Sequence, residues 1–167
     1  EYNIPARGLI GFRNQFLTLT NGAGILTSIF DRYDTMKSGQ MSGRLNGVLV
    51  SVETGKALTY SLETLQARGK LFVEHGQEIY NGQIIGLNSR DNDLGVNPTK
   101  GKKLDNMRAS GKDEVIALVP PVRHTLEQAL EFIQDDELCE VTPKSIRLRK
   151  KILDEGERTR AAKKAKN

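Results

Sequence analysis

The sequence predicts an α+β fold with a β-rich middle, and two patterns support this prediction. Apolar residues recur at helical spacing in 5–20 and again in 125–133. Between these segments lie short apolar runs of strand length, separated by turn residues that include many of the 16 Gly. Short strands with frequent Gly are typical of small barrels, so we expect a barrel-like middle and a few helices.

The first segment, Pro5–Thr20, predicts an amphipathic helix. Its apolar residues at intervals of three and four are Leu9, Phe12, Phe16 and Leu19. Pro5 suits the first helical position, and Gly22 suits the position just past the helix end. Ala23–Phe30 then predicts a strand. One helix and one strand cannot bury their own apolar faces, so we expect half of a split α/β sandwich in a fragment of a longer protein.

The middle of the chain predicts four short strands: Gly47–Glu53, Ala57–Ser61, Lys70–Glu74 and Gln83–Leu87. Thr54-Gly55 suits a hairpin turn between the first two strands, and Asn81-Gly82 is a strong tight-turn pair. Leu62–Arg68 predicts one or two helical turns, and Gly69 ends them.

A long polar segment, Asn88–Lys112, follows these strands. It carries six cations and three anions, with few aliphatic side chains. A connection of this length in a compact domain is usually a functional loop or a disordered segment. A basic loop held between strands would reach into a polyanion, and a solvated surface loop would explain the same composition.

The next elements predicted are a strand at Val115–Val119, a helix at Thr125–Ile133 and a strand at Leu138–Val141. Pro120 and Pro121 stop the first strand. Thr125 and Gln128 form the capping-box pattern that marks a helix start.

The last part, Ser145–Leu153, begins with strand alternation and leads into a basic tail. Arg147 and Arg149 lie on one face, about 6.6 Å apart, which is similar to the spacing of successive phosphates. This pair would suit a nucleic-acid backbone, and it would equally suit a charge-protected edge strand. From Lys144 onward there are ten cations and three anions, although the whole chain carries only +4. This uneven charge indicates a local anionic partner.

Motifs for nucleotide hydrolysis and metal binding are missing from the sequence. Thr54-Gly55-Lys56 is followed by Ala57 instead of Ser or Thr, so it is not a phosphate loop. His75 and His124 are isolated, and we expect no metal site. Tyr80, in a turn, is the nearest aromatic candidate for stacking on RNA.

The cysteine content and the hydropathy pattern indicate the cellular compartment of the protein. The single cysteine, Cys139, excludes an internal disulfide and suits a reducing cytosol. No run of 18 apolar residues predicts a transmembrane helix. We therefore expect a cytoplasmic protein without a membrane partner.

Five blocks of sequence carry a more specific signal: Pro5–Arg13, Leu65–Phe72, Gly82–Gly86, Gly101–Gly111 and Thr125–Ile133. Together they closely resemble the C-terminal part of the BipA/TypA translational GTPases. The resemblance covers Ile4 to Leu153. It implies that residues 1–35 are the second half of an elongation-factor-G-like domain V, which is a split β-α-β sandwich. It also implies a family-specific C-terminal domain at 38–157, with the basic loop 88–112, and a basic tail at 158–167.

The resemblance further implies function and partners. The longer protein would be a GTP hydrolase, with GTP and Mg²⁺ bound in an N-terminal domain and none in this chain. It would bind the ribosome and serve ribosome assembly and growth under cold or other stress. The basic loop would reach the acceptor end of aminoacyl-site tRNA and nearby rRNA, with ribosomal proteins as further neighbours. We expect a monomer that does not bind DNA.

Ten residues are expected to contact RNA, from the loop and from the alternating strand: Arg90, Lys100, Lys102, Lys103, Asn106, Arg108, Ser110, Lys112, Arg147 and Arg149. An alternative function is a protein-interaction module. Its acidic helix face, with Glu127 and Glu131, would contact ribosomal proteins or other domains of the GTPase. A third possibility, an enzyme, would need a pocket with convergent polar groups.

Overall fold

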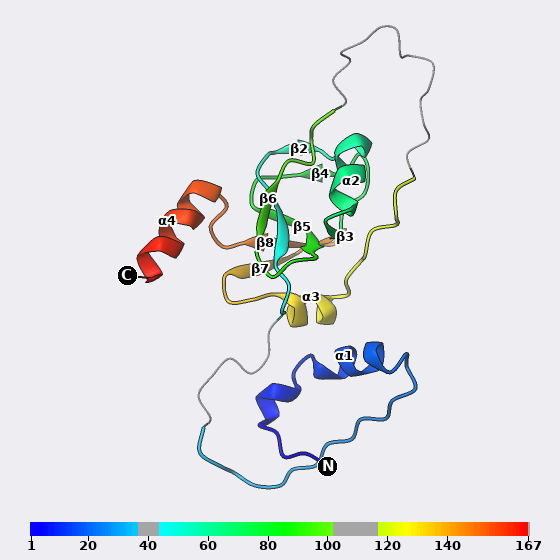
Figure 1. The fold of residues 1–167 in the computed structure, drawn as a ribbon, viewed down its shortest axis with the longest axis vertical. Helices are drawn as coiled ribbons and strands as arrows, with labels where there is room; N and C mark the ends of the chain where they lie inside the picture. Colours follow the sequence, from blue (N-terminus) through cyan, green and yellow to red (C-terminus); the bar gives the residue numbers. More distant parts are fainter. Residues whose placement is uncertain (37–43, 102–116, 167) are drawn as a thin grey trace, which may run out of the picture. The chain divides into compact units, whose positions relative to one another are not determined.

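The computed structural model describes residues 1–36, 44–101 and 117–166 (Figure 1). The chain divides into two units, Glu1–Arg44 and Leu45–Asn167. The α+β class is confirmed, because the second unit contains a mixed sheet together with helices.

The first unit contains a short 3-10 helix, η1 (Ala6–Leu9), and then α1 (Phe12–Leu19). The prediction of one continuous helix over Pro5–Thr20 was therefore wrong. Gly11 has φ of 75°, and this left-handed backbone cannot continue a right-handed helix. The apolar spacing survives the break, and the rings of Phe12 and Phe16 lie 6.2 Å apart.

We expected Gly22 to occupy the position just past the end of α1, but Asn21 occupies it. Asn21, with φ of 50°, takes the left-handed position that directly follows the helix cap, and Gly22 has φ of 80°. The N–H of Gly22 donates to the carbonyl of Leu17 at 2.7 Å. This is the hydrogen bond of a Schellman motif, with Asn in the place that Gly usually occupies.

The strand predicted at Ala23–Phe30 is not formed in the described part of the first unit. Ile25 and Ile29 expose 88% and 89% of their surface. A strand needs a hydrogen-bonded neighbour, and no described segment of this unit supplies one. The apolar pattern therefore predicted neither the strand nor the burial that the structure shows for this segment, because pairing depends on a partner that local sequence does not specify.

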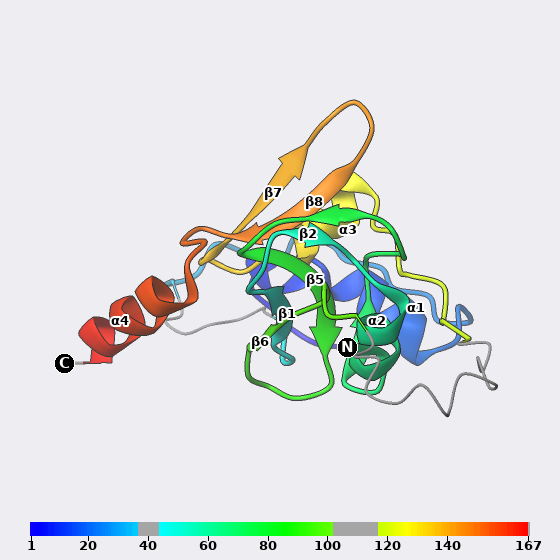
Figure 2. The ribbon, with the colours of Figure 1, turned by 90° about the horizontal axis from the view of Figure 1, so that it is seen from above.

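The second unit is built on a six-stranded mixed sheet with the order β6-β1-β5-β8-β7, and β3 also pairs with β5 (Figures 1 and 2). Its strands are β1 (Val48–Ser51), β3 (Gly69–Leu71), β5 (Gln83–Asn88), β6 (Leu94–Val96), β7 (Glu137–Val141) and β8 (Ile146–Lys150). β1 is antiparallel to β5 and parallel to β6. Because β6 and β7 end the order, the strands of the described residues do not close into the barrel that we expected.

The hairpin predicted around Thr54-Gly55 was also wrong. β2 (Gly55–Lys56) pairs with β4 (Glu78–Ile79) in a separate two-stranded sheet. The residues expected to form the second strand begin α2 (Thr59–Gln66) instead. The partners of β1 lie more than 30 positions away, so the sheet is assembled by non-local contacts that a local turn signal cannot reveal.

The sheet carries an apolar core on each face. Leu49 and Ile85 pack with Leu62 and Leu65 of α2 in one cluster. Their strand neighbours Val48, Val50 and Ile84 pack with Leu148 and Ala129 in the other cluster. Successive strand residues point to opposite faces, so α2 and the helix that carries Ala129 cover opposite sides of the sheet.

That second helix, α3 (Leu126–Phe132), begins as the sequence predicted. The hydroxyl of Thr125 accepts a hydrogen bond from the N–H of Gln128 at 3.3 Å, and the Gln128 amide oxygen accepts from the N–H of Thr125 at 3.0 Å. The capping box is therefore confirmed. The strand predicted at Val115–Val119 is not formed over 117–119, and 115–116 lie outside the described residues.

The segment Asn88–Lys112 is more ordered at its start than we expected. It contains β6, and Asp93 accepts a hydrogen bond from the N–H of Val48 at 2.9 Å. Residues 102–112 lie outside the described part of the chain. The tail is helical, as α4 (Glu155–Lys166).

Candidate nucleic-acid interface

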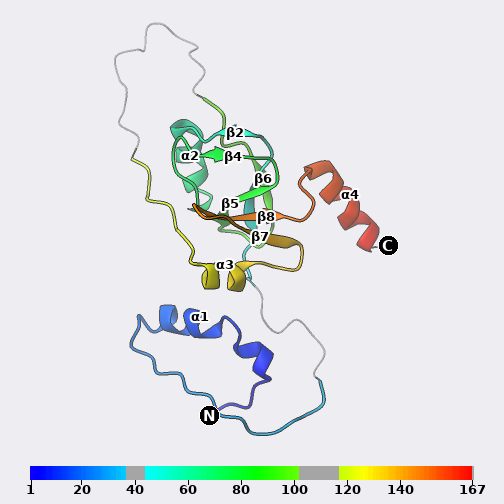
Figure 3. The same ribbon diagram turned by 180° about the vertical axis from the view of Figure 1, so that it is seen from behind.

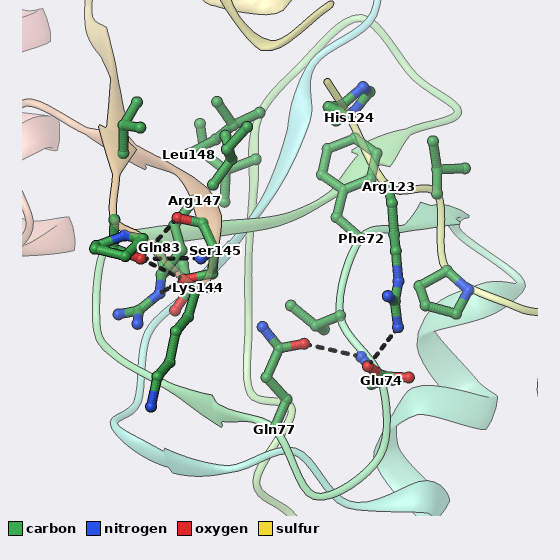
Figure 4. Close-up of a pocket in the computed structure, with 18 residues that line it drawn as sticks. Phe72, Glu74, Gln77, Gln83, Arg123, His124, Lys144, Ser145, Arg147 and Leu148 are labelled. Atoms are coloured by element: carbon green, nitrogen blue, oxygen red, sulfur yellow. Dashed lines mark hydrogen bonds and ion pairs between the residues drawn. The ribbon is translucent and has the colours of Figure 1, made fainter. Parts of the chain in front are cut away.

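A groove of about 540 Å³ opens beside the β7–β8 hairpin (Figure 4). One wall is the hairpin from Val141 to Leu148, and the opposite wall contains Phe72–Glu74 and Pro121–His124. Residues from four distant parts of the sequence line this groove, so it is a product of the tertiary fold.

The groove exists because β8 separates from β5 partway along its length. β8 pairs with β5 only at Leu148 and Arg149. Further along, β3 takes the place of β8 as the neighbour of β5. Leu71 of β3 pairs with Gly86 of β5, and the N–H of Phe72 donates to the carbonyl of Ile85 at 2.8 Å. The first half of β8 must therefore leave the sheet together with β7, and Figure 2 shows this hairpin projecting from it. The space between the two paths is the groove.

Three cations line the groove: Lys144 in the hairpin turn, Arg147 on β8 and Arg123 on the opposite wall. Arg123 pairs with Glu74 at 2.9 Å, with both side chains largely exposed. The Arg147 Nε donates to the Ser145 hydroxyl at 3.2 Å, which orients the guanidinium. Glu74 is the one carboxylate among the described lining residues, so the lining carries a net positive charge. Such a groove attracts anions.

An aromatic contact shapes the wall opposite the hairpin. The rings of Phe72 and His124 meet edge to face with centroids 4.6 Å apart, and Phe132 packs against both. Burial lowers the pKa of His124 below its ordinary value of 6.5. His124 is therefore neutral at pH 7, and the positive charge of the groove comes from Lys and Arg.

Arg149 lies two residues from Arg147 on the same face of β8, but it has a different role. Its Nε lies 2.9 Å from a carboxylate oxygen of Glu140. The other oxygen of Glu140 accepts a hydrogen bond from the Tyr80 hydroxyl at 2.7 Å. Burial, and then the hydrogen bond to Glu140, raises the pKa of Tyr80. The pair predicted from strand alternation is thus divided, with Arg147 in the groove and Arg149 neutralised within the fold.

Arg90 and Lys100 lie away from the groove. Arg90 is exposed in the turn after β5, where its carbonyl accepts a hydrogen bond from Gly47 at 2.8 Å. Lys100 is exposed after β6, next to Gly101, which approaches Leu58 at the start of α2. The other six predicted contact residues lie outside the described residues: Lys102, Lys103, Asn106, Arg108, Ser110 and Lys112.

Sequence reasoning missed the buried charge cluster around Lys150. The Lys150 Nζ lies 2.6 Å from Asp93, 2.7 Å from Asp136 and 3.0 Å from Glu137, and its side chain is only 2% exposed. Burial by itself lowers the pKa of Lys150, but the three carboxylates, Asp136 first, raise it above the ordinary value. Lys150 lies two residues after the apolar Leu148, so strand alternation already indicated that its side chain points toward the core.

Two other kinds of site find no support in the described ranges. No group of three or more His, Cys, Asp or Glu side chains is arranged there to hold a metal ion. None of the helices described is long and apolar enough to cross a membrane.

The single cysteine, Cys139, lies on β7. Burial raises the pKa of its thiol, which favours the uncharged form.

Comparisons with known proteins converge on one family. The family model described as the TypA/BipA C-terminal domain matches residues 46–155, and the one described as the elongation factor G C-terminus matches residues 1–43. The chain is 61% identical to the large ribosomal subunit assembly factor BipA of Escherichia coli and of Haemophilus influenzae, and 55% identical to that of Buchnera aphidicola. Each match covers 96% of this chain and 26% of the relative, so the chain spans about a quarter of their length.

Proposed function

The chain belongs to the TypA/BipA family, and from this premise we propose that it is the RNA-contacting C-terminal module of a ribosome-associated translational GTPase. The observation that carries the proposal is the cationic groove, in which Lys144 and Arg147 have no carboxylate within ion-pair distance among the described residues. Lys and Arg side chains left without acidic partners are suited to phosphate.

In this proposal the three parts of the chain have different roles. Residues 1–35 belong to an elongation-factor-G-like domain V, 38–157 form the RNA-contacting domain, and 158–167 add basic charge. The basic loop 88–112 contacts rRNA and the acceptor end of aminoacyl-site tRNA. The groove contacts a second stretch of phosphates.

The whole protein would bind GTP and Mg²⁺ outside this chain and hydrolyse the nucleotide. Its relatives carry the name large ribosomal subunit assembly factor, so we propose that it acts in ribosome assembly in the cytoplasm, and in adaptation to cold or other stress. In this scheme the chain itself contributes binding and not catalysis.

The proposal is tested by the salt dependence of binding to the large ribosomal subunit. We expect the groove variant K144Q/R147Q and the loop variant K102A/K103A/R108A each to bind more weakly. Each lost phosphate contact lowers the slope of log affinity against log salt by about 0.7 to 0.9. A matched control, K56Q/K70Q, removes two exposed cations of the small strands β2 and β3. Equal affinities and slopes for all four proteins would contradict the proposal.

The outer face of α3 favours a second candidate function, a protein-interaction module. Leu126 and Leu130 expose 39% and 55% of their surface, and Glu127 lies between them in the sequence. An exposed apolar pair with acidic neighbours suits a basic protein surface, such as that of a ribosomal protein. L126S/L130S would then weaken subunit binding without changing the salt slope, whereas an unchanged affinity would exclude this surface.

A further inference from the structure

The terminal helix α4 begins at a well-defined cap. The Asp154 carboxylate accepts a hydrogen bond from the N–H of Glu157 at 2.9 Å, and the Asp154 carbonyl accepts one from the N–H of Arg158 at 3.0 Å. Asp154 is therefore the N-cap, and Glu155 and Glu157 add the first-turn acids that favour a helix start.

The start of α4 also contacts the residues just before it and the glycines of the β-sheet unit. Arg158 donates from Nη1 to the carbonyls of Ile152 and Leu153, at 3.1 and 2.5 Å. Leu153 lies against Gly82, where an added Cβ would come within 2.6 Å of the Leu153 Cα. Glu155 lies against Gly95 of β6, where its carboxylate would collide with an added Cβ. The contacts of Leu153 and Glu155 place the start of α4 beside Gly82 and Gly95.

Beyond its base, α4 stands away from the sheet in all three views (Figures 1, 2 and 3). Lys163 and Lys164 lie three and four positions after Arg160, so the three cations share one helix face. All three are exposed, and no ion pair joins them to a carboxylate of the described residues. Ala161 and Ala162 lie on the other side, and Glu157, three positions before Arg160, is an acidic residue at the base of the cationic face.

We propose that α4 is a fixed cationic arm that binds the phosphate rows of double-stranded RNA without reading sequence. This inference rests on the proposed function, because it takes RNA as the partner, and it adds a contact element and the class of RNA. The match to the TypA/BipA C-terminal domain ends at residue 155, where α4 begins. The arm thus lies outside the part that the family model describes.

The composition of α4 favours a duplex over a single strand. Unpaired RNA is held mainly by stacking on aromatic side chains, and 155–166 contains none. Thr159, the one hydroxyl residue of this stretch, hydrogen-bonds to the Glu155 carbonyl at 2.9 Å. Duplex RNA is recognised by shape and by phosphates, which a straight row of charges about 6 Å long can follow.

The test uses the full 167-residue chain, a fluorescent RNA duplex of about 20 base pairs and one of its strands alone. We expect the chain to bind the duplex more tightly than the single strand. R160Q/K163Q/K164Q should lower duplex affinity about tenfold or more and reduce the salt slope by about two to three. The control K56Q/R68Q/K70Q removes the same charge from exposed cations elsewhere and should change affinity less than about twofold.

A second variant separates helical geometry from charge. A162P keeps every cation but breaks the helix interior, so it should lose duplex affinity as R160Q/K163Q/K164Q does, with a loss of helical circular dichroism. Full duplex affinity in A162P would show that the tail binds through charge alone, whatever its conformation. That result would overturn the proposal of a helical arm.

The remaining outcomes are equally distinct. Unchanged duplex binding in both α4 variants, alongside weaker subunit binding in the groove variant, would overturn this inference and leave the proposed function standing. Tighter binding of the single strand would also overturn it. Failure to bind either RNA or the ribosomal subunit would remove both proposals together.

Discussion

At the residue scale, β8 uses its basic side chains in three ways. Arg147 lines the groove, Arg149 is paired with Glu140, and Lys150 is buried among three carboxylates. Sequence alternation correctly placed Arg147 and Arg149 on one face. It could not show which of the two meets a carboxylate. The register of β7 against β8 places Glu140 directly opposite Arg147, yet its carboxylate pairs with Arg149, which lies diagonally across the hairpin.

Lys150 offers the clearest test of stability at this scale. Replacing Lys150 with Met leaves three clustered carboxylates without their cation, so we expect a loss of about 3 to 5 kcal/mol in unfolding free energy. Urea denaturation measures this loss. Lys151→Met, at an exposed neighbour, should stay within about 0.5 kcal/mol of the unchanged protein. Equal effects at the two positions would show that the cluster does not stabilise the fold.

The pH dependence of Lys150 follows from the sign of its shift. Its pKa is raised in the folded state, so its stabilising contribution is complete below the ordinary value of 10.5 and is lost as pH rises through the folded pKa. The difference in unfolding free energy between the unchanged protein and Lys150→Met should therefore shrink in strong alkali. A difference that grows above that pH would contradict the ion cluster.

His124 gives a prediction on the acid side. Burial lowers its pKa, so the unfolded chain takes up a proton more readily, and stability should fall as pH drops below 6.5. This loss is at most about 1.4 kcal/mol per pH unit. His124→Gln, which cannot gain that charge, should remove part of the loss in urea titrations between about pH 7.5 and about pH 5. An identical acid-side slope in both proteins would show that His124 is not responsible.

At the scale of the element, the sequence predicted those features that are encoded locally. The α3 capping box depends on neighbouring residues only. The Asn81-Gly82 turn has a local signal too, with Gly82 at φ of 84°, but Gly82 also packs against the distant Leu153. The pairing of β2 with β4 and the partners of β1 depend on distant segments. The groove belongs to this second class, because it forms where β8 gives way to β3 beside β5.

The α3 cap supplies a prediction for one element. Thr125→Ala removes the oxygen that accepts the Gln128 N–H and should cost about 1 kcal/mol of unfolding free energy. Urea denaturation measures the cost. Thr125→Ser keeps a hydroxyl and should retain most of the stability. If Ser and Ala were equally destabilising, the hydroxyl hydrogen bond would not be the source of the effect.

At the scale of the whole molecule, the cations proposed to bind RNA lie outside the two apolar clusters that support them. The sheet and its two apolar clusters hold the groove walls in place, and α4 extends a second cationic surface from the same unit. Composition alone predicted an anionic partner for the last part of the chain, and the fold divides that charge between buried, groove-lining and projecting side chains.

We proposed above that this module contacts RNA phosphates on the ribosome. A cryo-EM map of the whole protein bound to the large ribosomal subunit tests that claim most directly. We expect rRNA or tRNA phosphate oxygens within about 4 Å of the Lys144 Nζ or the Arg147 guanidinium. A map in which the groove faces solvent or a protein surface, with no phosphate near either cation, would contradict the account.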